Sequence, residues 1–235
     1  MQSREALQHY LQSHQQQKKH KFMKVSPAKE NILKKIRQAL SHSTPIPFPG
    51  SEGNSSVFRP ATQESEIEFA EQFGKLQGKL LYCLNHVELV AQLNNLIAKN
   101  EWKKIFCCEK KLQDRLSSLQ FNLFSDSGLE QCDAAITGCE ALIARTGSIV
   151  MSTAQESGRT ASVYAPVHIC IAYTSQLVYD IRDGLQMIKG KYGSNIPSLI
   201  TFATGPSRTA DIEKTLVVGV HGPKEVYLFL VDEPA

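Results

Sequence analysis

Apolar and polar residues alternate along the chain in two ways, and the two patterns predict helices interleaved with strands. Apolar side chains that recur every three or four residues are typical of amphipathic helices. Short, continuous apolar runs bounded by turn residues are typical of buried strands. The helices predicted in this way span 27–40, 64–77, 86–99, 110–119 and 175–191. The strands predicted in this way span 79–83, 102–108, 121–124, 134–137, 148–152, 166–173, 199–202, 215–220 and 226–231.

This order of elements predicts an α/β fold. Strands that are apolar throughout are typical of a parallel sheet that is covered by helices on both faces. Between the elements, we interpret 138–147 as a small turn or helix and 153–165 as a polar surface loop. We therefore expect a three-layer sandwich around a mostly parallel sheet, preceded by an N-terminal helical arm.

Composition divides the chain into three parts. Residues 1–25 are rich in Gln, Lys and His and poor in apolar side chains, which predicts a polar, disordered extension. Residues 26–60 hold a helix that begins at Ser26-Pro27 and a linker rich in proline and serine. Residues 61–235 carry the α/β domain. We interpret 1–22 as an optional extension or a start-site artefact, because Met23 stands just before the first helix.

The distribution of charge argues against nucleic acid as the partner. The formal net charge is +3, but residues 1–24 alone carry +4, so the rest of the chain is slightly acidic. No apolar run approaches the ~20 residues that span a bilayer, and the N-terminus has no secretory signal. We therefore expect a cytoplasmic protein without a membrane span. The first helix is expected to pack on its own domain, with an oligomer contact as the alternative.

Six cysteines are present, but they show neither a C-x-x-C pair nor a zinc-binding spacing. An iron–sulfur cluster usually needs closely spaced thiolates. The chain also has no Walker motif and no G-x-G-x-x-G motif for a dinucleotide. We therefore expect reduced thiols, and no metal or cofactor bound by this chain.

The segment 201–223 carries the densest set of candidate ligand-binding residues. Glycine lets a backbone approach a ligand closely, and a helix that opened at 210–213 would offer N–H groups to an anion. A capped surface turn with Arg208 in solvent is the alternative. The candidates in this segment are Gly205, Ser207, Arg208, Thr209, Asp211, Glu213, His221 and Gly222.

Two further polar clusters precede this segment. The first consists of Glu140, Thr146, Gly147 and Ser148, and its small residues and hydroxyls either offer N–H and O–H donors to an anion or form a tight turn. His168 is either a general acid/base or a buried histidine that hydrogen-bonds a neighbour. Arg159 is either a ligand contact or a solvated surface charge. We expect the three clusters to meet above the sheet. The catalytic candidates are His168, His221 and Asp211.

The sequences TGPSRTADIE and GVHGP, with an A-x-T-G element at 144–147, resemble the LUD-domain family. The resemblance runs from 28 to 232 and is strongest from 138 onward. It implies a fold similar to the ribose-5-phosphate isomerase and CoA-transferase superfamily. It also implies a part in the oxidation of L-lactate to pyruvate by a three-component system. The resemblance further implies that the iron–sulfur clusters of that system lie in partner proteins and that this chain corresponds to the component without cluster cysteines.

These observations leave hypotheses from different functional classes. The first is a subunit for lactate oxidation that binds a small carboxylate or a partner protein through the loops 204–213 and 221–223. The second is a stand-alone enzyme or binding protein for a small anionic metabolite, such as a sugar phosphate or an acyl-CoA. The third is a scaffolding module whose loops bind protein only. Fold analogy alone does not choose among them.

Overall fold

The computed structural model describes residues 27–41, 60–126, 128–209 and 217–233. It divides into two compact units, one that ends at Arg59 and one that begins at Pro60. The extension 1–25 expected from the sequence lies outside the described residues, as does most of the linker.

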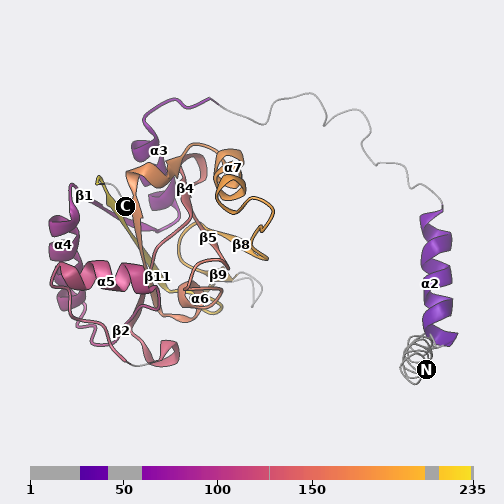
Figure 1. Ribbon diagram of the computed structural model, residues 1–235, viewed down its shortest axis with the longest axis horizontal. Coiled ribbons are helices and arrows are strands. Elements are labelled where there is room, and N and C mark those ends of the chain that lie inside the picture. Colours follow the sequence, from indigo (N-terminus) through magenta and orange to yellow (C-terminus); the bar gives the residue numbers. More distant parts are fainter. Residues whose placement is uncertain (1–26, 42–59, 127, 210–216, 234–235) are drawn as a thin grey trace, which may run out of the picture. The chain divides into compact units, whose positions relative to one another are not determined.

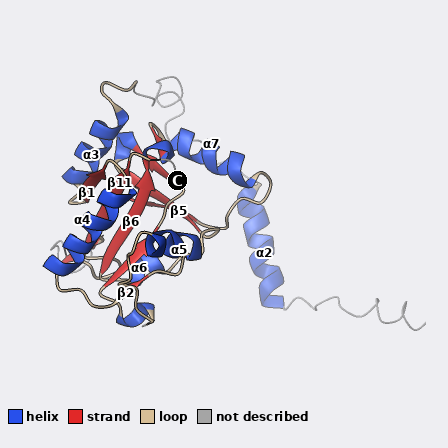
Figure 2. Cartoon of the chain, turned by 60° about the vertical axis from the view of Figure 1, so that its left-hand side comes forward, coloured by secondary structure: helices blue, strands red, loops and turns tan. Residues whose placement is uncertain are grey.

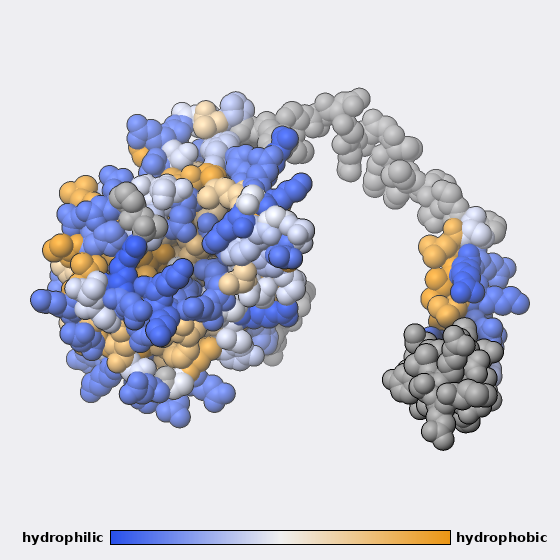
Figure 3. Space-filling view, in the orientation of Figure 1, coloured by the Kyte–Doolittle hydropathy of each residue, from blue (hydrophilic) through white to orange (hydrophobic). Residues whose placement is uncertain are grey.

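The first unit contains one described helix, α2 (Pro27–Leu40) (Figure 1). Its side chains Ile32, Ile36 and Leu40 recur at intervals of four, so they lie along one side of the helix. All three are exposed, and no residue of α2 is buried. Figure 3 shows this apolar stripe with hydrophilic residues on the opposite side. The predicted helix is therefore present, and it is amphipathic.

The second unit is built on a sheet of five strands that are all parallel (Figure 2). Two inner strands, β6 (Val167–Tyr173) and β11 (Glu225–Val231), are buried on both faces, which explains their continuous apolar runs. In spatial order the strands are β1 (Lys79–Cys83), β11 (Glu225–Val231), β6 (Val167–Tyr173), β3 (Ala134–Thr137) and β2 (Ile105–Phe106). The predicted α/β class and mostly parallel sheet are confirmed.

A second sheet of four strands is mainly antiparallel. Its spatial order is β7 (Leu177–Val178), β4 (Ala141–Ile143), β5 (Ser148–Ser152) and β8 (Ile200–Ala203). The short strands β9 (Arg208–Thr209) and β10 (Val217–Val218) form a separate antiparallel pair. The described strands of the segment 201–223 therefore divide between two sheets.

Five α-helices pack around these sheets in the second unit's described residues. They are α3 (Ser65–Lys75), α4 (His86–Lys99), α5 (Lys110–Ser118), α6 (Ala161–Tyr164) and α7 (Ile181–Tyr192). Three short 3₁₀ turns complete the described elements, and they are η1 (Leu129–Gln131), η2 (Ala144–Thr146) and η3 (Thr174–Gln176). No helix in the described ranges is long and apolar enough to cross a membrane.

The core lies on both faces of the parallel sheet. On one face, Ile169 and Phe229 pack with apolar residues of α4 and α5. On the other face, Cys170 and Leu228 pack with Phe73 of α3 and with the four-stranded sheet. Because successive side chains of a strand point to opposite faces, each strand contributes residues to two separate cores. A smaller cluster joins α7 to the outer face of the four-stranded sheet.

Several boundaries predicted from the sequence are wrong. The expected strand 121–124 is an isolated bridge between Phe124 and Ile105. The expected turn at 138–147 contains β4, because its short apolar run pairs with β5. The loop 153–165 contains α6. The expected helix 175–191 begins at 181 instead, because Asp180 is its N-cap and the residues before it form η3 and β7.

Candidate functional site

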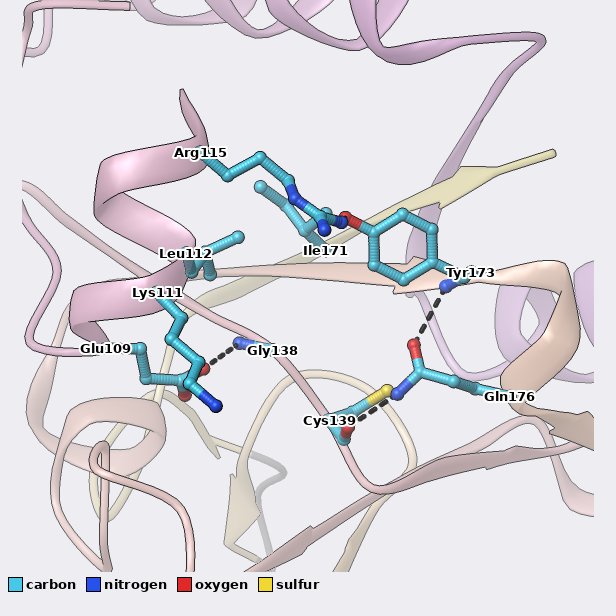
Figure 4. Close-up of a pocket in the computed structure, with 9 residues that line it drawn as sticks. All are labelled: Glu109, Lys111, Leu112, Arg115, Gly138, Cys139, Ile171, Tyr173 and Gln176. Atoms are coloured by element: carbon cyan, nitrogen blue, oxygen red, sulfur yellow. Dashed lines mark hydrogen bonds between the residues drawn. The ribbon is translucent and has the colours of Figure 1, made fainter. Parts of the chain in front are cut away.

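A cavity of about 250 Å³ lies at the carboxyl ends of strands in the parallel sheet (Figure 4). Gly138 and Cys139 follow β3, and Tyr173 ends β6. Helix α5, which follows β2, forms the opposite wall with Lys111 and Arg115. Ligands of open α/β sheets bind outside the carboxyl ends of the strands. The cavity is therefore in the position where the fold favours a ligand.

Helix α5 gives this cavity two cations. Lys111 and Arg115 are four residues apart, so they lie on the same face of the helix. The Arg115 Nη1 donates a hydrogen bond of 2.9 Å to the Tyr173 hydroxyl (Figure 4). The guanidinium carbon lies 5.7 Å from the centre of the Tyr173 ring. Among the residues that the structure describes, neither cation is paired with a carboxylate. Two unpaired cations beside a cavity favour an anionic ligand.

The loop after β3 forms the floor of the cavity and is held by Glu109. The Glu109 Oε2 accepts a hydrogen bond of 3.0 Å from the Gly138 backbone N–H. A Cβ on Gly138 would lie 3.0 Å from the same oxygen, so glycine permits this close approach. The other oxygen, Oε1, is buried and has no hydrogen-bond partner in the described part of the chain. Glu109 therefore fixes the loop and leaves one acceptor unsatisfied near the cavity.

Gln176 connects the two strand ends above this floor. Its Nε2 donates to the Cys139 carbonyl at 2.7 Å, and its Oε1 accepts from the Tyr173 N–H at 2.9 Å (Figure 4). Burial raises the pKa of the Cys170 thiol, and the neighbouring Cys139 thiol raises it further. The Cys170 thiol is therefore protonated at neutral pH, which makes it a poor nucleophile and a poor metal ligand. No cluster of three or more His, Cys, Asp and Glu side chains suited to a metal occurs in the described ranges.

A second polar cluster, centred on Glu140, lies next to the same loop and is closed. The buried Glu140 carboxylate accepts hydrogen bonds from Ser152 at 2.6 Å, Tyr192 at 2.7 Å and Lys191 at 2.8 Å. Burial alone would raise the pKa of Glu140, but these three donors lower it below its usual range. Each carboxylate oxygen has a partner, so the cluster fastens β5 and α7 to the loop and leaves no acceptor for a ligand.

The first sequence-predicted cluster lies in the interior. Thr146 Oγ1 is 2.7 Å from Ser148 Oγ, which is 3.2 Å from Thr204 Oγ1. Gly147 has φ +61°, and a Cβ there would lie 2.4 Å from the backbone nitrogen of Phe73. Gly205 meets α3 in the same way, because its Cβ would lie 2.6 Å from the Leu76 carbonyl oxygen. The hydroxyls satisfy one another, and the two glycines let the backbone pack against α3.

The second sequence-predicted cluster separates. His168 is buried in β6, and its Nε2 lies 2.8 Å from Thr137 Oγ1 on β3. The Thr137 hydroxyl donates to the Gly138 carbonyl, so the Nε2 of His168 carries the proton in this pair. Burial lowers the pKa of His168 to about 4. Arg159 lies elsewhere, donating a hydrogen bond of 3.0 Å to the exposed Ser198. His168 therefore has the contacts of a structural histidine.

The third sequence-predicted cluster lies partly at the amino ends of the parallel strands. His221 and Gly222 line a cavity of about 510 Å³ there, together with Pro166 before β6 and Lys224 before β11. Ser207 packs against Gly222, and its N–H donates to the Pro223 carbonyl at 2.9 Å.

The third cluster has four further members, two on β9 and two acidic residues after it. Arg208 is exposed on β9, which also contains Thr209. Asp211 and Glu213 lie outside the described residues, as does the proposed helix start at 210–213. The described members of the three clusters therefore do not converge on one site.

The residues that line the carboxyl-edge cavity were missed by the sequence analysis. They include Glu109, Lys111, Arg115, Gly138 and Gln176. One signal was present in the sequence, since two basic residues four apart lie in the predicted helix 110–119, which follows a predicted strand. The pairing of Glu109 with Gly138 gave no signal, because the two residues are far apart in sequence and meet through the order of the strands.

Comparison with known proteins gives related sequences and a related fold. Residues 125–231 match the family model of the LUD domain. Lactate utilization protein C from Deinococcus radiodurans is 34% identical over 108 residues, which are 46% of this chain and 50% of that protein. Lactate utilization protein C from Bacillus licheniformis is 37% identical over 106 residues, which are 44% of each chain. The chain thus matches about half the length of these relatives or less.

A crystal structure of a DUF162 family protein from Deinococcus radiodurans has a similar fold. The TM-score is 0.53 at 19% sequence identity, and the match covers 74% of this chain and 99% of that one. This likeness supports the α/β fold alone. The resemblance expected from the motifs at 144–147, 204–213 and 219–223 falls inside the region that matches the family model. Residues 125–231 of this chain are therefore similar to the LUD-domain family.

Proposed function

We propose that this chain is a component of lactate utilization that binds a small carboxylate at the carboxyl edge of its parallel sheet. The family match and the relatives named lactate utilization protein C support the pathway. The pair of cations, Lys111 and Arg115, supports the ligand class. The proposed ligand position differs from the loops 204–213 and 221–223 that the sequence favoured, because the described parts of those loops lie apart from this cavity.

The observation that carries the proposal is the unpaired guanidinium of Arg115 beside the cavity. Its Nη1 donates to the Tyr173 hydroxyl, and the guanidinium forms no ion pair with a carboxylate of the described residues. A guanidinium offers five donors in a rigid fork that matches a carboxylate. Lys111, one helical turn away, adds a second charge to the same wall. A carboxylate bound between them exchanges water for charge-assisted hydrogen bonds.

The proposal assigns electron transfer to partner proteins that carry iron–sulfur clusters. Oxidation of a hydroxy acid needs an electron acceptor, and amino-acid side chains alone do not provide one. Burial raises the pKa of Cys83 to about 11 and that of Cys107 to about 12. Metal ligation requires the thiolate, so these cysteines are poorly suited to hold a cluster. The chain would then bind and present the carboxylate to the partner.

Isothermal titration with L-lactate tests the ligand part of this proposal. In Arg115→Gln we expect the Kd to rise roughly 10- to 150-fold, because a hydrogen bond to a charged group contributes about 1.5–3 kcal/mol. The matched control is Lys189→Gln, which removes an exposed charge from α7 away from this cavity. An unchanged Kd in Arg115→Gln, or an equal loss in Lys189→Gln, would contradict the assigned position.

A mild affinity purification of the natively expressed protein tests the partner part. We expect cysteine-rich iron–sulfur proteins in the eluate, together with dye reduction that depends on L-lactate. Purification of the chain alone, without lactate-dependent activity, would contradict the partner proposal. It would favour the alternative of a stand-alone protein for a larger anion, such as a sugar phosphate or an acyl-CoA. The adjoining cavity of about 580 Å³, which shares Arg115, provides the space for that alternative.

A further inference from the structure

We propose that the cavity beyond Arg115 recognises a hydroxyl group of the bound anion, with His86 as the hydrogen-bond acceptor and Glu233 as the residue that positions it. The proposal rests on the proposed function, because it takes Arg115 as the carboxylate contact. It adds a property that carboxylate binding alone does not require, which is a preference for hydroxycarboxylates. The supporting features are the shared cavity wall, the His86–Glu233 pair and an unsatisfied ring nitrogen.

Arg115 lies on the border of two cavities at the carboxyl edge. One is the cavity described above, and the other has a volume of about 580 Å³ and is lined by His86, Glu233 and Ser118 among others. Tyr173 lies near both Arg115 and His86. Its ring centre lies 5.7 Å from the guanidinium carbon of Arg115 and 5.7 Å from the centre of the His86 ring. The cation and the imidazole thus border the same aromatic side chain.

The Glu233 carboxylate fixes the orientation of His86. It pairs with the ring Nδ1, and its Oε2 also accepts a hydrogen bond of 3.1 Å from the His86 backbone N–H. The backbone bond, followed by the ring bond, lowers the pKa of Glu233, so the carboxylate is ionised and can only accept. Nδ1 therefore carries the proton. In the neutral ring this leaves Nε2 as an acceptor with a lone pair.

This acceptor has no partner in the part of the chain that the structure describes. Nε2 of His86 is buried and makes no hydrogen bond, while the side chain as a whole keeps 18% of its surface exposed. An unsatisfied buried acceptor is costly, and a ligand hydroxyl that donates to it removes that cost. A carboxylate lacking the hydroxyl cannot do so. A hydroxycarboxylate held by Arg115 therefore satisfies a group that its unsubstituted analogue leaves unpaired.

The test compares L-lactate with propionate, which differs from it by the hydroxyl group alone. We expect the wild-type full-length chain to bind L-lactate roughly 5- to 10-fold more tightly than propionate. In His86→Phe, which keeps an aromatic ring beside Tyr173, the two affinities become equal while propionate binding is retained. In Arg115→Gln, both ligands bind more weakly. Because the readout is a ratio within one variant, a general loss of folded protein does not imitate the result.

Three outcomes would overturn the inference. Equal binding of both ligands by the wild-type chain removes the hydroxyl contact and leaves carboxylate binding intact. A lactate preference that persists in His86→Phe removes His86. Binding of neither ligand overturns this inference and the small-carboxylate proposal together. If His86→Phe does not fold, ¹⁵N shifts of the wild-type His86 ring give the same decision. They should move with L-lactate and not with propionate, and unchanged shifts would contradict the contact.

Discussion

Two polar regions meet at the loop after β3, and they differ in how completely their hydrogen-bonding groups are satisfied. On one side, the buried Glu140 carboxylate has three donors, from Ser152, Lys191 and Tyr192. On the other side, the Glu109 Oε1 lacks a partner within the described residues, and the cations of α5 form no ion pair with them. The first region holds structural elements together, and the second leaves its groups for a ligand.

The two histidines differ in where their unsatisfied ring nitrogen lies. His168 is fully buried within the sheet; its Nε2 is bonded to Thr137 on the adjacent strand, and its Nδ1 has no partner among the described residues. His86 lies at the end of the sheet beside a cavity, and its Nε2 is unsatisfied. Residue type alone does not distinguish these roles, since both histidines occur in or next to apolar strands in the sequence. An unsatisfied hydrogen-bonding atom beside a cavity is therefore a better guide to a ligand-binding site than a polar sequence motif.

The largest effect on stability is expected from Gly147→Ala, which tests whether the closed region is structural. The backbone at this position has φ +61°, and an added Cβ would lie 2.4 Å from the Phe73 backbone nitrogen. We expect a loss of about 3 kcal/mol or more, from left-handed strain and overpacking together. Urea unfolding measures it. Gly158→Ala is the matched control, with φ +59° and no atom within 4 Å, and it should lose only the strain. Equal losses would contradict the packing role.

A pH-dependent effect of similar size is expected from His168. Burial lowers its pKa from 6.5 to about 4, so the unfolded chain binds a proton at higher pH than the folded chain. The stability is fully present above about pH 6.5 and falls as the pH decreases towards 4. The difference amounts to about 3 kcal/mol. Urea unfolding across this range should show a steeper pH dependence for the wild type than for His168→Gln. Identical slopes would rule out the neutral, buried histidine.

A smaller loss is expected from Glu140→Ala, which opens the closed cluster. The substitution leaves the Ser152 and Tyr192 hydroxyls without their acceptor, while the half-exposed Lys191 regains water. We expect a loss of about 2 kcal/mol in urea unfolding. The exposed Glu66→Ala on α3 serves as the control and should change stability little. A Glu140→Ala protein as stable as the control would mean that the cluster is not structural.

The smallest effect on stability is expected from Lys111→Gln, in the open region. The Lys111 side chain is exposed and forms no ion pair with the described residues, so the free energy of unfolding should change by less than about 0.5 kcal/mol. Its effect should appear in the affinity for L-lactate, which titration measures. A large loss of stability without a change in affinity would reverse the comparison and make the open region structural.

The sequence determined the class of the fold, because the signals for it are local. The apolar runs of β6 and β11 and the N-cap residue Asn85 lie close to the elements that they specify. The family motifs were equally readable, because a contiguous string of residues identifies them. The sequence also placed Gly147 and Gly205 at positions that need glycine, although both serve packing against α3.

The tertiary structure decided which polar groups meet, because that depends on strand order. Glu109 bonds to Gly138 since β2 and β3 are adjacent, and Arg115 reaches Tyr173 since β6 follows β3 in the sheet. His221 lies at the opposite edge, because its loop precedes β11 instead of following it. Sequence spacing carries no record of the strand order or of the edge at which a loop lies. Only the folded sheet separates the satisfied polar groups from those left for a ligand.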